Sequence, residues 1–287
     1  MSVLETLTLD SGNEALQTAA LALEKGLVLY FPSSAFALQG EESAFLTPAI
    51  VDPRSKNISF DLATDGLRGT VCQGGQADLL KSMLRRYAIF SHRLIERVLP
   101  GYVPHLSQAR TSFRPVEAQG RATSYRKDDT RLHVDAFPAN PVNGRRILRV
   151  FTNVNRQGKP RVWRMGEPFA DVAEAFLPKI DAPIPGFAHL LYTLKITKAR
   201  RSSYDHYMLK LHDAMKADMD YQRRVKQEEV RFPPGSTWIV FTDQVSHAAM
   251  SGQHMFEQTF YLPPEGLQHP ELSPLKTLER LLNRTLL

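Results

Sequence analysis

The sequence predicts one α+β domain with a β-sandwich or β-barrel core. Helical patterns come first along the chain, strand patterns dominate from about residue 107, and a helical stretch interrupts the strands before the last two of them. No internal repeat or low-complexity tract is present in the sequence. Strands that follow helices, rather than alternating with them, are typical of α+β domains and not of parallel βα repeats.

The N-terminal third is predicted to be mostly helical. Residues 13–25 consist of good helix formers and end at Gly26, a residue type that commonly terminates helices. Residues 27–31 follow as a short apolar strand. The clearest helix covers residues 77–98, where apolar residues recur at helical spacing, and Pro100 ends it.

Strands and a helical insertion are predicted over the rest of the core. Runs rich in apolar and β-branched residues predict strands at 109–114, 123–126, 147–154, 236–242 and 255–262. Helical patterns at 167–178 and about 202–225 interrupt these strands. We therefore expect one domain over residues 1–287, with helical support in 1–106, a β core in 107–264, a helical insertion at about 167–228 and a C-terminal helix in 265–287.

The C-terminal segment is predicted to form an amphipathic basic helix. Leucines recur at helical spacing from Leu272 to Leu286, while Lys276, Arg280 and Arg284 occupy other positions. Packing of the apolar side on the body of the protein, or on a second subunit of a homo-oligomer, is favoured over contact with a membrane.

Composition is that of an ordinary globular protein, with 43% hydrophobic and 23% charged residues. The single cysteine, Cys72, excludes an internal disulfide framework and a cysteine-based zinc or iron–sulfur site. The N-terminal residues lack the basic and apolar regions of a signal peptide, and no apolar run reaches the roughly 18 residues that span a bilayer. We therefore expect a cytoplasmic protein.

The chain is basic, with a net charge of +6 and a pI of about 9.4, which favours anionic partners. Much of the excess lies between Arg145 and Arg164, where seven Lys or Arg residues occur without any acidic residue. This segment begins ten residues after Asp135, so we expect the positive charge to lie near the candidate site described next.

The segment 129–138 contains His133 and Asp135, which are separated by one residue. Residues i and i+2 of an extended segment point to the same side, so the imidazole and the carboxylate would project into one cavity. His-x-Asp alone is a weak motif, but His247 follows the predicted strand 236–242 and precedes a turn and another strand. Two histidines and one carboxylate on one side of a metal leave its other side open, which is the arrangement of non-haem Fe(II) oxygenases.

Zinc with a bound water is the competing interpretation of this set. The His-Glu-x-x-His signature of helical zinc sites is absent. Asp243 is the best candidate for a base near His247, although it could equally orient His247 as a hydrogen-bond partner. We rank zinc below iron.

Five segments resemble the Kdo 3-hydroxylase family, and they cover most of residues 107–264. They are Arg126-Lys-Asp-Asp-Thr-Arg-Leu-His-Val-Asp-Ala-Phe-Pro138, Arg146–Asn155, Trp163–Phe169, Tyr204–Asp213 and Asp243–Gln253. Members of this family are Fe(II)- and 2-oxoglutarate-dependent dioxygenases with a double-stranded β-helix (jelly-roll or cupin-like) core. They hydroxylate C3 of the outer 3-deoxy-D-manno-oct-2-ulosonic acid (Kdo) of Kdo-lipid A, which gives the Ko sugar of the lipopolysaccharide inner core.

The resemblance implies Fe(II), 2-oxoglutarate and O2 as cofactors, with ascorbate as a reductant in vitro. It also implies His133, Asp135 and His247 as iron ligands and catalytic residues, because each stands at the family's motif position. The implied substrate is an acidic, phosphorylated glycolipid, so a peripheral position on the anionic inner-membrane surface is expected.

The residue that binds 2-oxoglutarate is less obvious. Many such enzymes carry an arginine about ten residues after the second histidine, but no Arg or Lys lies between His247 and Lys276. Arg149, on the strand after His-x-Asp, is the candidate, which is similar to the lysine that asparaginyl hydroxylases and JmjC proteins place on that strand. Its guanidinium could bind a carboxylate bidentately, and Thr130 and Asn153 are further candidates.

Further basic residues are candidates for binding the sugar carboxylates and lipid phosphates of the implied substrate. They are Arg145, Arg146, Arg161, Arg164, Lys195, Lys198, Arg200 and Arg201. His206 and His212, in the predicted helical insertion, are interpreted as structural or substrate-facing.

Two other functions remain open. A 2-oxoglutarate oxygenase that acts on another anionic substrate, such as a protein or a nucleotide, would keep the iron site and change the pocket. A cupin-like protein that binds or isomerises a sugar without oxygen chemistry is the third interpretation. A nucleic-acid-binding module would explain the charge, but no such motif is present and the His-x-Asp and His247 set would have no role.

Overall fold

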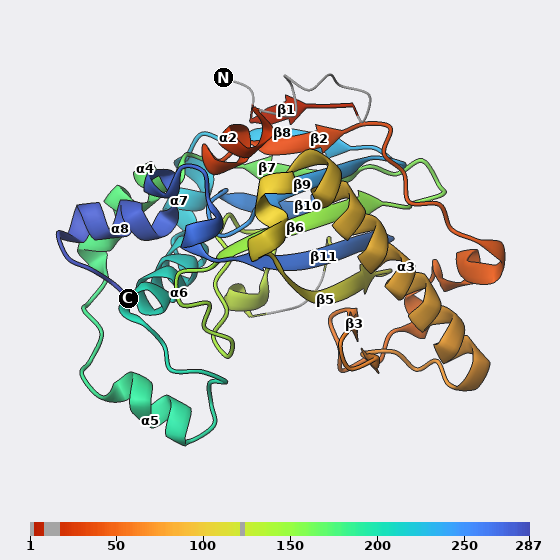
Figure 1. Ribbon diagram of the computed structural model, residues 1–287, viewed down its shortest axis with the longest axis horizontal. Helices are drawn as coiled ribbons and strands as arrows, with labels where there is room; N and C mark the ends of the chain where they lie inside the picture. Colours follow the sequence, from red (N-terminus) through yellow and green to blue (C-terminus); the bar gives the residue numbers. More distant parts are fainter. Residues whose placement is uncertain (1–2, 9–17, 121–123) are drawn as a thin grey trace.

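A computed structural model describes residues 3–8, 18–120 and 124–287 of the chain (Figure 1). Within these ranges, strands form two sheets. The large sheet has the order β1-β2-β9-β6-β11-β5-β3-β4, and the small sheet has the order β10-β7-β8. The parallel β1–β2 pair is the exception to antiparallel pairing in both sheets.

The strands are short, as is usual in antiparallel sheets. Their bounds are β1 Leu4–Thr6, β2 Val28–Phe31, β3 Ile58–Asp61, β4 Gly66–Arg68, β5 Ser107–Arg114, β6 Arg146–Asn153, β7 Arg161–Met165, β8 Glu228–Phe232, β9 Thr237–Phe241, β10 His247–Ser251 and β11 Met255–Leu262.

An aromatic core packs the small sheet against the large one. Trp163 of β7 contacts Trp238 of β9 edge to face, with ring centroids 5.7 Å apart, and Phe232 of β8 stacks on the same Trp238 at 3.9 Å. Phe151 of β6 lies in the same cluster. Because successive strand residues point to opposite faces, Arg149 lies on the same face of β6 as Phe151, toward the small sheet.

Helices cover the outer face of the large sheet. The helix α3 (Gly74–Val98) crosses this face (Figure 1), and its buried residues Leu94 and Ile95 pack with Leu148 and Val150 of β6. The short α2 (Ala19–Glu24) joins this cluster. Since β6 is covered on both faces, every one of its residues is buried.

Four α-helices lie between β7 and β8: α4 (Phe169–Phe176), α5 (Phe187–Thr193), α6 (Ser203–Ala217) and α7 (Met219–Arg224). The C-terminal helix α8 (Pro274–Leu282) packs against α4 and α6, where Leu275, Leu278 and Leu286 are buried. This confirms that the leucine-rich side of the tail packs on the body of the protein. No helix in the described ranges is long and apolar enough to cross a membrane.

Most predicted elements are present, with bounds shifted by a few residues. The strand predicted at 123–126 is wrong, because residues 125–127 form a single 3₁₀ turn; residue 123 is outside the described ranges. Only the second half of the predicted helix 13–25 can be compared, because residues 9–17 are also outside them. The sequence patterns did not predict the helix α5 or the strands β1, β3, β4, β7, β8 and β10.

Candidate metal centre

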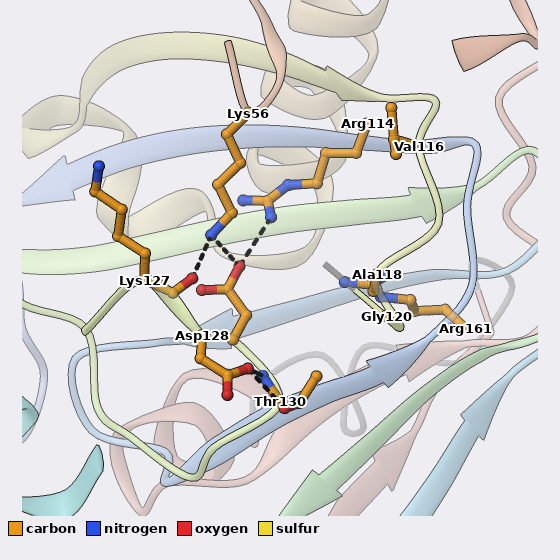
Figure 2. Close-up of a pocket in the computed structure, with 10 residues that line it drawn as sticks. Lys56, Arg114, Val116, Ala118, Gly120, Lys127, Asp128, Thr130 and Arg161 are labelled. Atoms are coloured by element: carbon orange, nitrogen blue, oxygen red, sulfur yellow. Dashed lines mark hydrogen bonds and ion pairs between the residues drawn. The ribbon is translucent and has the colours of Figure 1, made fainter. Parts of the chain in front are cut away.

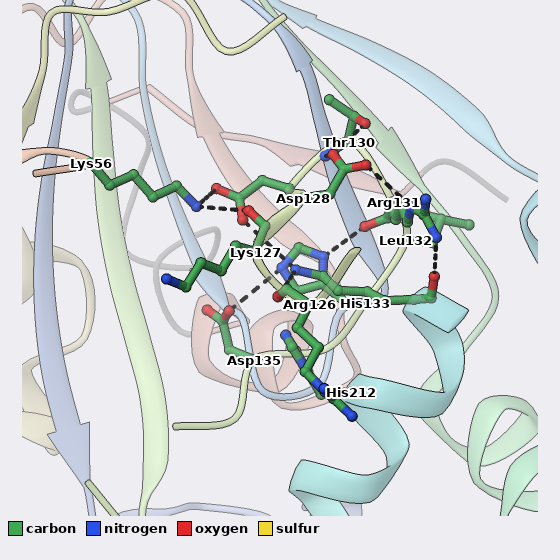
Figure 3. Close-up of polar contacts among 12 residues, drawn as sticks. Lys56, Arg126, Lys127, Asp128, Thr130, Arg131, Leu132, His133, Asp135 and His212 are labelled. Atoms are coloured by element: carbon green, nitrogen blue, oxygen red, sulfur yellow. Dashed lines mark hydrogen bonds and ion pairs between the residues drawn. The ribbon is translucent and has the colours of Figure 1, made fainter. Parts of the chain in front are cut away.

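The structure brings His133, Asp135 and His247 together. One ligand atom of each residue lies within 4.8 Å of the other two, and His133 Nε2 lies 3.7 Å from Asp135 Oδ1. His133 and Asp135 lie on an extended segment before β6, and His247 begins β10. In Figure 3 the ring of His133 faces the carboxylate of Asp135, with His212 of α6 beside it.

Backbone hydrogen bonds fix this arrangement. His133 N–H donates to the carbonyl of His247 at 3.0 Å, and His247 N–H donates back to His133 at 2.9 Å. Two residues further on, Asp135 N–H donates to the carbonyl of Thr242 at 2.7 Å. The His133 segment therefore acts as an additional edge to the small sheet, and the i, i+2 spacing places both side chains on one side of it.

Each histidine has one ring nitrogen occupied and the other available. His133 Nδ1 lies 2.8 Å from the carbonyl of Arg131, and His247 Nδ1 lies 2.8 Å from that of Val245. A carbonyl accepts only from N–H, so the proton is on Nδ1 and Nε2 presents its lone pair, as in metal-binding histidines. Burial lowers the pKa of both imidazoles, so both remain neutral.

Asp135 is held in its ionised form. Burial opposes ionisation, but the neighbouring Arg149 guanidinium outweighs it and holds the pKa of Asp135 well below its usual value. Arg149 Nη2 lies 3.1 Å from Asp135 Oδ2. Two neutral imidazoles and one ionised carboxylate make a donor set suited to a divalent transition metal.

A cavity of about 590 Å³ opens beside the three residues, within the range of small-molecule binding sites. Its apolar wall includes Phe137, Phe151 and Trp163, and the Trp163 indole stacks on His247 with ring centroids 5.0 Å apart. The polar lining carries seven Lys or Arg residues and three Asp residues, so an anionic ligand is favoured. The basic residues are Lys56, Arg114, Arg126, Lys127, Arg149, Arg161 and Lys216.

A chain of ion pairs runs along the cavity wall. From Asp135 it passes through Arg149 to Glu257, with Arg149 Nη1 and Glu257 Oε1 3.1 Å apart. Arg114 then joins Glu257 to Asp129, a carboxylate that also contacts Lys56 and Lys216. Figure 2 shows Lys56 and Arg114 converging on this point, and a smaller hollow lies beside them. The Asp135 carboxylate is thus electrostatically connected to the basic lining.

Comparison with known proteins places this site in a family. The sequence model described as 3-deoxy-D-manno-oct-2-ulosonic acid (Kdo) hydroxylase matches residues 8–285. The chain belongs to the Kdo hydroxylase family. Among curated protein sequences, none matches it.

Solved structures of the Kdo hydroxylase KdoO, a non-heme Fe(II) α-ketoglutarate-dependent dioxygenase, are similar over nearly the whole chain. The cobalt(II) complex is 50% identical with a TM-score of 0.96, covering 99% of this chain and 97% of that one. The complex with α-ketoglutarate and Fe(III) is 49% identical with a TM-score of 0.95 and the same coverage. A further complex of KdoO, also 49% identical with a TM-score of 0.95, contains succinate and Fe(III).

For this member of the Kdo hydroxylase family, the predicted site residues separate into two groups. His133, Asp135, His247, Arg149 and Arg161 all line the cavity. The other predicted residues do not line it: Thr130, Asn153, Arg145, Arg146, Arg164, Lys195, Lys198, Arg200 and Arg201.

Two of these residues are buried and have protein partners. Arg146 is fully buried, and its Nε donates to Asp243 at 2.7 Å, so it does not reach a substrate. This pairing also corrects the expectation that Asp243 orients His247, because the carbonyl of Val245 does so. The amide of Asn153 donates to the carbonyls of Lys159 and Phe232, which makes it a structural residue.

The remaining predicted residues lie outside this cavity, so their contact with a cofactor or substrate stays a prediction. The Thr130 hydroxyl donates to Asp128 and lines only the smaller hollow. The Arg145 guanidinium lies over the Tyr261 ring, 4.8 Å from its centroid. Arg164 lines a separate, shallow depression with Glu229. The four basic residues between 195 and 201 belong to the segment around α5.

The sequence did not single out Lys56, Arg114 or Lys216, three basic residues of the cavity. Lys56 comes from a segment without clear periodicity, and Arg114 ends a strand that was predicted correctly. Lys216 is only 1% exposed on α6, and this burial is the structural signal that distinguishes it from an ordinary surface lysine. Of the two histidines left open, His212 lines the cavity, whereas His206 Nε2 pairs with the carbonyl of Asp181.

Proposed function

We propose that this chain is an Fe(II)- and 2-oxoglutarate-dependent dioxygenase that hydroxylates C3 of the outer Kdo sugar of Kdo-lipid A, forming Ko. One observation carries the proposal: the His133, Asp135 and His247 donor set opens onto a basic cavity in a member of the Kdo hydroxylase family. The KdoO complexes with Fe(III) and either α-ketoglutarate or succinate support the cofactor and its product.

The donor set fits iron. We assign Nε2 of His133, Nε2 of His247 and the Asp135 carboxylate as the ligands, since all three face one point and are in the protonation state that a metal requires. Bound there, iron supplies the oxidation chemistry by which dioxygen and 2-oxoglutarate give succinate, carbon dioxide and a hydroxylated sugar. The chain itself positions the reactants and excludes water from them.

We assign Arg149 to the carboxylate of 2-oxoglutarate that does not face the metal. Arg149 lines the cavity, and Asp135 and Glu257 balance its charge. Because both carboxylates hold the guanidinium, its position as a hydrogen-bond donor is rigid. Its Nε is buried without a hydrogen-bond partner among the described residues. Arg161 and Lys216 lie on the same cavity lining and are candidates for the acidic sugar.

The arrangement of strands supports a double-stranded β-helix. The four central strands of the large sheet, β9-β6-β11-β5, face a second layer made of β8, β7, β10 and the His133 segment. Four strands against four, with the metal-facing residues at the edge where β10 meets the His133 segment, is the arrangement expected of a jelly-roll or cupin-like core.

A peripheral position on the cytoplasmic side of the inner membrane follows from the proposed substrate, because a Kdo-lipid A molecule is held in a bilayer. The basic net charge of +6 favours such an anionic surface. The α8 helix is not the element we assign to this contact, nor to a homo-oligomer, since its leucines are buried within the chain.

Succinate release tests the proposal. We expect release from 2-oxoglutarate to rise when Kdo-lipid A is added and not when lipid A without Kdo is added. Succinate release that neither lipid stimulates would favour an oxygenase of another anionic substrate. Absence of release under every condition would favour a sugar-binding protein without oxygen chemistry.

A further inference from the structure

The segment between α4 and α6 exposes a cluster of large apolar side chains. Ten large hydrophobic residues are exposed in the described part of the chain, and six of them lie between residues 184 and 196. They are Ile184, Phe187, Leu190, Tyr192, Leu194 and Ile196, with exposed fractions from 47% to 69%. In Figure 1 the helix α5 stands away from the sheets and from the other helices, at the end of two connecting stretches.

Folding of the chain does not explain these side chains. No residue of α5 is buried, so its apolar residues contribute nothing to the cores around the two sheets. A helix of seven residues is marginal by itself in water. Contiguous exposed apolar surface of this kind marks a site of interaction with a protein or a membrane.

The charges around the apolar cluster indicate which partner it meets. Residues 182–201 contain four basic residues, Lys195, Lys198, Arg200 and Arg201, and no acidic residue. Lys195 lies between Leu194 and Ile196, and the other three follow the apolar residues along the chain, toward the body of the protein. Exposed apolar side chains flanked by Lys and Arg residues are complementary to a bilayer, which has an apolar interior and anionic phosphates at its surface. Dimerisation through this surface would instead place the Lys and Arg residues of two copies close together, where they repel each other.

The segment is attached beside the cavity. Lys198 N–H donates to the carbonyl of Ala139 at 2.9 Å, and Arg201 donates to the carbonyl of Pro138. Pro138 and its neighbour Phe137 line the cavity that contains the metal-binding residues. At the other end, His206 Nε2 and the Asp181 carbonyl are 2.9 Å apart. A partner that binds the exposed apolar side chains of residues 184–196 therefore lies close to the rim of this cavity.

We propose that residues 182–197 form a membrane-insertion element. The apolar side chains enter the boundary between headgroups and acyl chains of an anionic bilayer, while Lys195, Lys198 and Arg200 meet the lipid phosphates. The element thereby brings the cavity rim to the level of the headgroups. That last role rests on the proposed action on Kdo-lipid A, whereas binding to the bilayer does not.

Co-sedimentation with vesicles of phosphatidylglycerol and phosphatidylethanolamine, free of any Kdo lipid, tests this proposal. The test variant is Phe187→Ser/Leu190→Ser/Leu194→Ser, and the control is Val71→Ser/Ile89→Ser, which removes similarly exposed residues elsewhere on the surface. We expect the test variant to lose at least about tenfold in vesicle partitioning and the control to match the wild type. Phosphatidylcholine vesicles and high salt should weaken wild-type binding.

Three results would overturn the proposal. One is a wild-type protein that does not bind the vesicles, and another is a correctly folded test variant that binds as well as the wild type. The third is a wild type that dimerises in solution through this surface, without vesicle binding, while the test variant is monomeric. Failure of the proposed function is distinct, because it would leave vesicle binding intact while detergent-dispersed Kdo-lipid A is not hydroxylated.

Discussion

Arg149 and Asp135 form a buried ion pair in which Nη2 of the arginine lies 3.1 Å from Oδ2 of the carboxylate. The other carboxylate oxygen of Asp135 lies 3.7 Å from Nε2 of His133. The arginine therefore fixes the orientation of a metal-facing carboxylate from behind. Its other amino group pairs with Glu257, so rotation of the guanidinium would deprive Asp135 of its arginine partner and leave Glu257 with Arg114 alone.

Replacement of Arg149 by lysine tests this dual role. Lysine keeps the charge but cannot span Asp135 and Glu257 together. We expect Arg149→Lys to weaken Co(II) affinity by about 10- to 100-fold, as is typical when the partner of a metal ligand is lost. We also expect the KM for 2-oxoglutarate to rise by at least roughly tenfold. Metal titration and 2-oxoglutarate titration measure the two effects separately.

Arg164→Lys is the matched control for this experiment, since Arg164 is an exposed arginine outside the cavity. It should leave both quantities unchanged. Weaker metal binding in Arg149→Lys with an unchanged KM for 2-oxoglutarate would restrict Arg149 to orienting Asp135. The carboxylate of 2-oxoglutarate would then be bound by another basic residue of the cavity.

The buried pair of Arg146 and Asp243 should determine stability rather than substrate binding. Arg146→Met leaves Asp243 buried and unpaired, so we expect the free energy of unfolding to fall by about 3–5 kcal/mol. The double variant Arg146→Met/Asp243→Leu should recover part of that loss. Urea unfolding measures both variants. Unchanged stability together with a higher KM for the glycolipid would restore Arg146 as a substrate-binding residue.

The C-terminal helix should behave as part of the core. Leu278 is fully buried between α8, α4 and α6, so Leu278→Ala should lower the free energy of unfolding by about 2–5 kcal/mol. Vesicle binding by the folded variant should not change, because the insertion element is elsewhere. Loss of vesicle binding without loss of stability would instead assign the membrane contact to α8.

His254 should make the metal-free protein less stable in acid. Burial lowers the pKa of this histidine in the folded state, so below about pH 6.5 the unfolded chain binds a proton that the folded protein does not. Its contribution to stability is therefore lost as the pH falls through that value. His254 has a φ of 60°, and asparagine tolerates this left-handed conformation.

His254→Asn therefore provides the comparison. Between about pH 7.5 and about pH 5.5, the wild type should lose more free energy of unfolding than the variant does. Chelator-treated protein is used for both, so that metal release does not contribute. Equal losses would show that His254 titrates alike in the folded and unfolded states.

The sequence predicted the three residues that the structure brings together, and local geometry explains two of them. His133 and Asp135 are two positions apart on an extended segment, so their common direction follows from the backbone alone. The strand at 147–154 was also predictable, because its apolar and β-branched residues match a buried strand. His247 was grouped with His133 and Asp135 only from its setting after a predicted strand and from the resemblance, since nothing local joins it to a segment more than a hundred residues earlier.

What the sequence did not predict depends on partners distant along the chain. Arg146 was interpreted as a substrate-binding residue because its partner, Asp243, lies 97 positions away in the sequence. The strand β7 mixes charged with apolar residues, and its basic residues Arg161 and Arg164 were interpreted as ligand-binding positions. The apolar residues of α5 resemble core residues in sequence, and only the structure shows that they are exposed.

Mass spectrometry of Kdo-lipid A tests the central claim most directly. The lipid is incubated with the protein, Fe(II), ascorbate and dioxygen, with and without 2-oxoglutarate. We expect it to gain one oxygen atom only when 2-oxoglutarate is present, and not at all with His133→Ala. No gain while 2-oxoglutarate is consumed would contradict the substrate, and no gain without consumption would contradict the iron-dependent reaction itself.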